Sequence, residues 1–247
     1  MTQQPVNLSS DLNEAIDFET YGLFMTPVTK YKMKDHVDDV LKWARNQDFV
    51  DIKERQVLCH NVQQIGKTNQ ILADLPALKA TLLEAVRKHN ESGLCYASNF
   101  EISDCYLEVA HQGAIYAPHE HSNCLFSGTF FISYNEQSHS YLKFKRNVVS
   151  AMYPVMMLPF EQMTAFNLQE ATVPYSQGDC LIYPSNLTHG YESNPSENRI
   201  TLTFNVIPVW CKKYSHPLRI SVSRVFPQLL HSNSTESFPQ ITPKSVE

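Results

Sequence analysis

The chain is poor in charge. Only 18% of its 247 residues are charged and the formal net charge is −5. Because no basic stripe is available to neutralise phosphates, nucleic acid is not an expected partner. No apolar run approaches the length of a membrane span, and the longest, around Val206–Trp210, ends a predicted strand. The opening MTQQPVNLSSDLNEAID has no basic segment followed by an apolar one, so we expect no signal peptide, no membrane partner and a cytoplasmic location.

The sequence also lacks the cysteine pattern of a disulfide-rich protein. The 6 cysteines include no CxxC or CxxxC pair, and their density is not that of a disulfide scaffold, so we expect free thiols. A hydrophobic share of 43% is enough for one substantial core. We predict a flexible N-terminus over residues 1–20, one domain over 21–228 with its barrel core at about 100–210, and a disordered tail over 229–247.

Helices are predicted before residue 100 and strands after it. Apolar residues at helical spacing predict an amphipathic helix over Asp35–Arg45, and a second helix over Leu75–His89 has Pro76 in its first turn. An early strand is predicted over Gly22–Lys32. Short apolar and aromatic runs between turn signals predict further strands at Ser103–Val109, Ala114–His119, Leu125–Tyr134, Ser140–Lys145, Gly178–Tyr183 and Arg199–Pro208. This order indicates an α+β, mainly β fold, an antiparallel jelly-roll-like barrel with N-terminal helices on one sheet.

The pattern His119-Glu-His121 carries the chemistry. Residues two apart on a strand point to the same face, so the two imidazoles form a pair of candidate metal ligands. His189, in the turn after a later strand, would complete a three-point site. Arg199 lies ten residues beyond it and could bind a carboxylate, and Thr201 shares its strand face.

Taken in order, these motifs resemble those of the 2-oxoglutarate/Fe(II)-dependent oxygenase superfamily, which has a double-stranded β-helix fold. One oxygenase family in particular has an early Phe-x-Thr-Pro, then His-x-His followed by Ser-Gly, then Pro-Ser-x-x-x-His, and Arg-x-Ser/Thr before Phe-Asn. The corresponding segments here, besides the histidine pair, are Phe24–Pro27, Ser127–Gly128, Pro184–His189 and Arg199–Asn205. The resemblance covers roughly residues 20–210.

The resemblance implies a dioxygenase with Fe(II) as cofactor and 2-oxoglutarate as cosubstrate. Such an enzyme uses O2 to hydroxylate a C–H bond of a small molecule, amino acid or peptide, and releases succinate and CO2. It also implies that His119 and His189 bind iron, and that Arg199 and Thr201 bind the distal carboxylate of 2-oxoglutarate. A planar guanidinium suits that role because it matches a carboxylate with two hydrogen bonds.

One position departs from the superfamily. Most members place Asp or Glu two residues after the first histidine, which gives two histidines and one carboxylate. Here that position is His121, and strand alternation turns Glu120 away. We therefore predict a three-histidine site, His119, His121 and His189; the alternative has one histidine outside the coordination and water at an open position.

Other interpretations stay open. The spacings also resemble those of cupins, although Leu125 and Phe126 occupy the place of the usual cupin acidic ligand. A three-histidine cupin dioxygenase or isomerase without 2-oxoglutarate is one alternative, and a non-catalytic metal- or ligand-binding barrel is another. The pair Arg199 and Thr201 favours the oxygenase, unless the arginine is an ordinary surface residue.

The substrate pocket is less well defined by the sequence. Aromatic residues on the same barrel could shape it or could be plain core: Tyr106, Tyr116, Phe131 and Tyr183. The insert at residues 147–175 has no recognisable substrate motif. The sequence leaves the substrate and the oligomeric state open.

Overall fold

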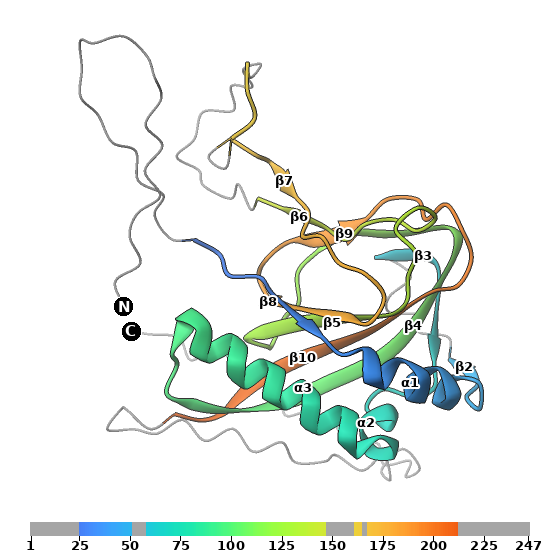
Figure 1. Ribbon diagram of the computed structural model, residues 1–247, viewed down its shortest axis with the longest axis horizontal. Coiled ribbons are helices and arrows are strands. Elements are labelled where there is room, and N and C mark those ends of the chain that lie inside the picture. Colours follow the sequence, from blue (N-terminus) through green and yellow to red (C-terminus); the bar gives the residue numbers. More distant parts are fainter. Residues whose placement is uncertain (1–24, 51–57, 147–160, 165–166, 212–247) are drawn as a thin grey trace, which may run out of the picture.

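The computed structural model describes residues 25–50, 58–146, 161–164 and 167–211 (Figure 1). Within this part, the chain forms a 10-stranded, curled antiparallel sheet with helices on one face. Most of the strands follow one another across the sheet in the order β1 (Thr29–Lys32), β8 (Asp179–Pro184), β5 (Phe126–Ser133), β10 (Arg199–Cys211), β4 (Ser98–His119), β9 (His189–Tyr191), β6 (Lys143–Lys145) and β7 (Glu170–Ala171). In addition, β3 (Cys59–Ile65) pairs with β4 and with β2 (Phe49–Val50).

Strand β4 links the two halves of the barrel. Its residues from Ser98 to Ala110 pair with β10, whereas Tyr116 and His119 pair with β9. Sequence patterning predicts two strands here, divided at Gly113, and that division is wrong. Gly113 adopts a positive φ of 79° and its N–H donates to the carbonyl of Asn194 at 2.7 Å, so the chain bends without leaving the strand.

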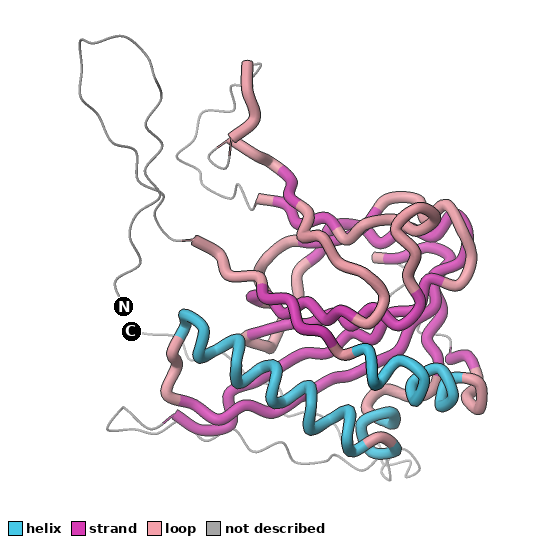
Figure 2. Tube along the Cα trace, viewed as in Figure 1, coloured by secondary structure: helices cyan, strands magenta, loops and turns pink. Residues whose placement is uncertain are grey.

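The helices cover the outer face of the large sheet (Figures 1 and 2). A 3-10 turn (Lys34–His36) runs into α1 (Val37–Ala44), and α3 (Pro76–His89) matches the second predicted helix and continues into a π-helical segment, Asn90–Leu94. The short α2 (Gln70–Asp74) was not predicted, because its few residues show too little periodicity.

The main core lies between these helices and the sheet. The helices contribute Leu82 and Val86 among others, and the strands contribute Leu107, Leu202 and Phe204, all at most 1% exposed. Strand alternation places the neighbouring residues of β4 and β10 on the other face, inside the barrel. The same strands therefore carry core side chains on the face toward the helices and a second set of side chains on the face inside the barrel.

The boundaries of other predicted elements differ in detail. Strand β1 covers only the end of the expected Gly22–Lys32, whose first residues lie outside the described part, and β6 is shorter than Ser140–Lys145. His189, predicted in a turn, instead begins β9. Strands β2, β3 and β7 were not predicted. The flexible N-terminus, the disordered tail and most of the 147–175 insert fall outside the described residues, so the domain boundaries stay a prediction.

The cysteines and the helices of the described residues bear on two further expectations, free thiols and no membrane span. Their cysteines, Cys59, Cys95, Cys105, Cys124 and Cys180, are free thiols. Of the helices among these residues, none has the length and apolar character that crossing a bilayer requires.

Candidate metal centre

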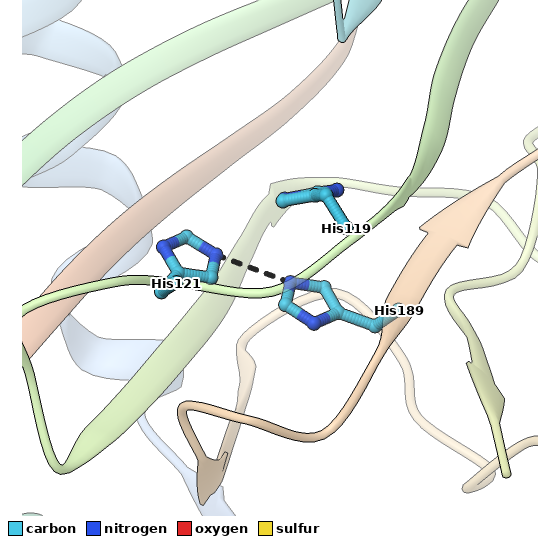
Figure 3. A group of neighbouring side chains, drawn as sticks. All are labelled: His119, His121 and His189. Carbon is cyan, nitrogen blue, oxygen red and sulfur yellow. Dashed lines mark hydrogen bonds between the residues drawn. The ribbon is translucent and has the colours of Figure 1, made fainter. Parts of the chain in front are cut away.

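Three histidines converge at one end of the barrel (Figure 3). His119 is the last residue of β4, His121 follows two residues later, and His189 begins β9. His119 and His189 are Cα partners in the β4–β9 ladder, so antiparallel pairing brings together residues far apart in the chain. One ring nitrogen from each of the three lies within 4.8 Å of the other two.

Backbone contacts allow this convergence. A Cβ added to Gly190 would come within 2.5 Å of the carbonyl oxygen of Tyr116, so the close approach of β9 to β4 requires glycine. Beyond the end of β4, the N–H of His121 donates to the carbonyl of Ser185 at 2.9 Å, which holds this segment beside the turn before β9. Glu120 points away, is exposed, and accepts a hydrogen bond of 2.8 Å from the hydroxyl of Thr188.

Hydrogen bonds to the backbone orient two of the rings. Nδ1 of His119 lies 2.8 Å from the carbonyl oxygen of Ala117, and Nδ1 of His189 lies 2.8 Å from that of Leu187. Because a carbonyl only accepts, each Nδ1 carries the hydrogen and each neutral ring keeps its lone pair on Nε2. Such partners commonly fix the orientation of metal-binding histidines.

The spacing of the nitrogens fits a metal ion. The Nε2 atoms of His121 and His189 are 3.2 Å apart. An ion about 2 Å from each imidazole nitrogen would hold two adjacent ligands about 3 Å apart. This donor set could therefore bind one transition-metal ion.

Electrostatics keeps the buried ring neutral. Desolvation by burial, helped by the neighbouring His119 and His121, lowers the pKa of His189 to about 3, and the hydrogen bond to the Leu187 carbonyl opposes this shift only in part. His189 is therefore uncharged at neutral pH. The uncharged imidazole is the form that binds metals.

Arg199 lies in the same pocket. It is the first residue of β10 and only 2% exposed, so it is not a surface arginine. Its guanidinium carbon lies 4.2 Å from the ring centroid of Tyr191, and its Nε donates to the carbonyl of Ser140 at 3.3 Å. Thr201, two residues along the same strand face, is also buried and lines the pocket.

The four predicted aromatic residues divide into two pairs. Tyr106 and Tyr116 line the pocket with the histidines. Tyr183 lies behind it, with its hydroxyl 3.2 Å from Nε2 of His189 and 2.9 Å from the hydroxyl of Thr129. Phe131 stacks on the ring of Tyr175 at 3.7 Å between centroids and packs near the guanidinium of Arg199.

Further lining residues were missed by the sequence analysis. They are Glu108, Thr129, Leu142, Gly190, Tyr191 and Thr203. Strand alternation was the available signal, because Thr203 follows Thr201 by two positions and Tyr191 follows His189 by two. The same signal reaches Glu108, which follows Tyr106 by two positions on β4, whereas its Cα pairing with Thr201 is not revealed by the sequence.

Comparisons with known proteins concern the family and the fold. A family model described as "Putative 2OG-Fe(II) oxygenase" matches residues 104–205, a range that contains the three histidines, Arg199 and Thr201. The resemblance to the 2-oxoglutarate/Fe(II)-dependent oxygenase superfamily is thereby confirmed. A search of the curated proteins finds no match.

Several solved structures share the fold. One is a prolyl-4-hydroxylase from Pseudomonas putida, with a TM-score of 0.50, 12% identity, and coverage of 73% of this chain and 91% of that one. A 2OG-Fe(II) oxygenase-family oxidoreductase from Burkholderia pseudomallei has a TM-score of 0.50, 7% identity, and coverage of 73% and 84%. SnoN, an alpha-ketoglutarate-dependent epimerase of nogalamycin biosynthesis, has a TM-score of 0.54, 12% identity, and coverage of 74% and 77%. At such identities the likeness concerns the fold, and the predicted double-stranded β-helix is confirmed.

Proposed function

We propose that this protein is an Fe(II)- and 2-oxoglutarate-dependent oxygenase with a three-histidine metal site. The family match and the fold support the class. The observation that carries the site is the burial of a guanidinium, Arg199, in the pocket onto which His119, His121 and His189 converge. A guanidinium held in a metal-binding pocket suits the distal carboxylate of a cosubstrate, which it can meet with two hydrogen bonds.

When bound, Fe(II) and 2-oxoglutarate supply the oxidising chemistry, in which O2 and 2-oxoglutarate are consumed, a substrate C–H bond becomes C–OH, and succinate and CO2 are released. The three imidazoles hold the ion. Their neutrality leaves the charge of the ion uncancelled, which favours a dianionic cosubstrate. The hydrogen bonds of His119 and His189 to backbone carbonyls keep the donor atoms aimed at the ion.

Arg199 and Thr201 bind the distal carboxylate of the cosubstrate. Contact with the Tyr191 ring holds the guanidinium in place, so little side-chain entropy is lost when the anion arrives. The hydroxyl of Thr201 donates a further hydrogen bond from the same strand face. Tyr106 and Tyr116 line the pocket and exclude water from the reacting centre.

The proposal defines the substrate only by its general class. The related structures include a prolyl-4-hydroxylase and the epimerase SnoN, also solved with Fe3+, alpha ketoglutarate and nogalamycin RO at a TM-score of 0.52. Those names describe those proteins. By analogy we propose a small molecule, amino acid or peptide as substrate and hydroxylation as the reaction.

A second candidate is a three-histidine dioxygenase of the cupin type that does not use 2-oxoglutarate. Among the described residues, the group that could hold a metal consists of histidines without a carboxylate, which favours this candidate. The buried Arg199 favours the first candidate, because a cupin of this kind needs no buried guanidinium beside its metal.

The test uses the full chain reconstituted anaerobically with Fe(II). On exposure to O2 with 2-oxoglutarate, the protein should form succinate, measured by mass spectrometry, and a chelator should stop the reaction. Metal retention without 2-oxoglutarate binding or succinate formation would contradict the proposal and favour the cupin-type or non-catalytic alternative.

A histidine variant tests the ligand set. His189→Ala should reduce the metal content to background by elemental analysis, since a site of three ligands loses one that is buried. His111→Ala is a matched control, because this ring lies outside the site against Glu197 and Gln63. A His189→Ala protein that retains a full equivalent of iron would refute the assignment.

A further inference from the structure

Glu108 is a buried carboxylate in the same pocket that the proposed mechanism leaves unused. It is 5% exposed and lies on the inner face of β4, where Thr201 is its Cα partner on β10. The hydroxyl of Tyr116 lies 3.4 Å from its Oε1. The Tyr116 ring in turn stacks on His119, with centroids 4.8 Å apart. One tyrosine therefore separates this carboxylate from a histidine of the cluster.

The same carboxylate also lies near the arginine side of the pocket. Burial raises the pKa of Tyr191; the charge of Arg199 opposes this shift and the charge of Glu108 adds to it. Both side chains line one pocket with Tyr191, whose ring the guanidinium contacts at 4.2 Å, and the Cα partner of Glu108 is Thr201, two residues from Arg199. Glu108 is placed to influence an ion at the histidines and an anion at Arg199 together.

The net charge of the pocket indicates a role for Glu108. In a site with two histidines and one carboxylate, the carboxylate ligand cancels one of the two charges of a ferrous ion. Three neutral imidazoles cancel none. With Arg199 added, a three-histidine pocket would have one positive charge more than the dianion 2-oxoglutarate can balance, and an unbalanced charge in a buried site is costly. Glu108 removes that excess.

We propose that Glu108 is the charge-compensating carboxylate of this centre. It acts from the pocket wall in place of a carboxylate ligand and sets the balance between cation affinity and dianion affinity. This proposal rests on the three-histidine, 2-oxoglutarate-binding site of the proposed function. It makes Glu108 a positioning and specificity residue, with no bond to the ion.

The decisive variant is Glu108→Gln, which keeps the shape and removes the charge. Two affinities are measured anaerobically: that of the full chain for Co(II), and that of the Co(II)-loaded protein for 2-oxoglutarate. Co(II) should bind about tenfold more weakly, because the cation loses a nearby negative charge. The dianion 2-oxoglutarate should bind several-fold more tightly, because the same charge no longer repels it. Damage to packing would weaken both.

Two controls separate charge from shape. Glu108→Asp keeps the charge and should restore Co(II) affinity to within about threefold of wild type. Glu101→Gln removes a carboxylate of the same strand that does not line the pocket, and should change Co(II) affinity by less than about threefold. If Glu108→Gln does not fold, Glu108→Thr supplies a neutral residue well suited to a strand.

The outcomes are distinguishable. Unchanged affinities in Glu108→Gln, or a parallel loss of both, would overturn this inference and leave the oxygenase assignment intact, provided that the wild type binds both ligands. A wild-type protein that binds neither Co(II) nor 2-oxoglutarate would overturn the proposed function, and the role of Glu108 with it.

Discussion

Strand β10 presents two faces with opposite character. Ile200, Leu202 and Phe204 pack against the helices, whereas Arg199 and Thr201, alternating with them, line the pocket. The helix-covered face buries apolar area, which is the main source of folding stability. The pocket face buries charged and polar groups that cost stability unless they are paired. Because successive side chains of a strand point to opposite faces, the residues that stabilise the fold lie on one face of this sheet and the residues that form the pocket lie on the other.

The helix-covered face should account for the largest effect on folding. Leu82 in α3 is 0% exposed in the main core, and Leu82→Ala should lower the free energy of unfolding by about 2–5 kcal/mol, measured by urea denaturation. Co(II) affinity of the remaining folded protein should not change. Lys88→Ala, on the exposed side of the same helix, serves as the control and should cost less than about 0.5 kcal/mol. Impaired metal binding in Leu82→Ala would show that the two faces are coupled.

Substitutions on the pocket face should affect ligand binding more than folding stability. Arg199→Ala should weaken 2-oxoglutarate binding about 100-fold, because the bound carboxylate loses its charged partner in a buried site. Isothermal titration of the metal-loaded protein measures this. Ile200→Ala changes the adjacent residue on the opposite face, and it should lower stability while leaving 2-oxoglutarate affinity within about twofold. Equal affinity in Arg199→Ala and wild type would exclude the assigned role of this residue.

A smaller effect should appear as a pH dependence of stability on the helix side. Burial lowers the pKa of His89 to about 4 from 6.5, and the ring lies against Phe126 with its Nδ1 2.7 Å from the Thr29 hydroxyl. The folded ring stays neutral while the unfolded one takes up a proton below pH 6.5. The stabilising contribution is therefore complete above this value and is lost as the pH falls towards 4.

The share of His89 in this loss should be about 2 kcal/mol between pH 7 and pH 5, read as the difference between wild type and a His89→Leu variant in urea denaturation at each pH. His89→Leu should make the pH profile shallower by that amount, while His189, whose pKa is also lowered, keeps its own contribution. Leu82→Ala, which changes a buried residue of the same helix that does not titrate, should lower stability at every pH and leave the slope of the profile unchanged. An unaltered profile in His89→Leu would show that other groups control the acid sensitivity.

The predictable parts of the molecule are those with a local signal. The helix over Pro76–His89 and most barrel strands follow from periodicity and turn residues, and the histidine cluster follows from a two-residue spacing and a family resemblance. What the sequence could not provide depends on pairing between distant segments. The continuity of β4 through Gly113 depends on its pairing with the segment around Asn194, and the pairing of Glu108 with Thr201 depends on the β4–β10 register.

The facing positions of His119 and His189 have a mechanical consequence. An ion held by both would cross-link the ends of two antiparallel segments and close the long loop of chain between them, which includes strands β5 to β8. Because the two ligands meet only in the folded chain, binding of the ion would stabilise the fold by mass action and would be lost on unfolding. Loss of iron would loosen the open end of the barrel while the helix-covered end stays closed by its own packing.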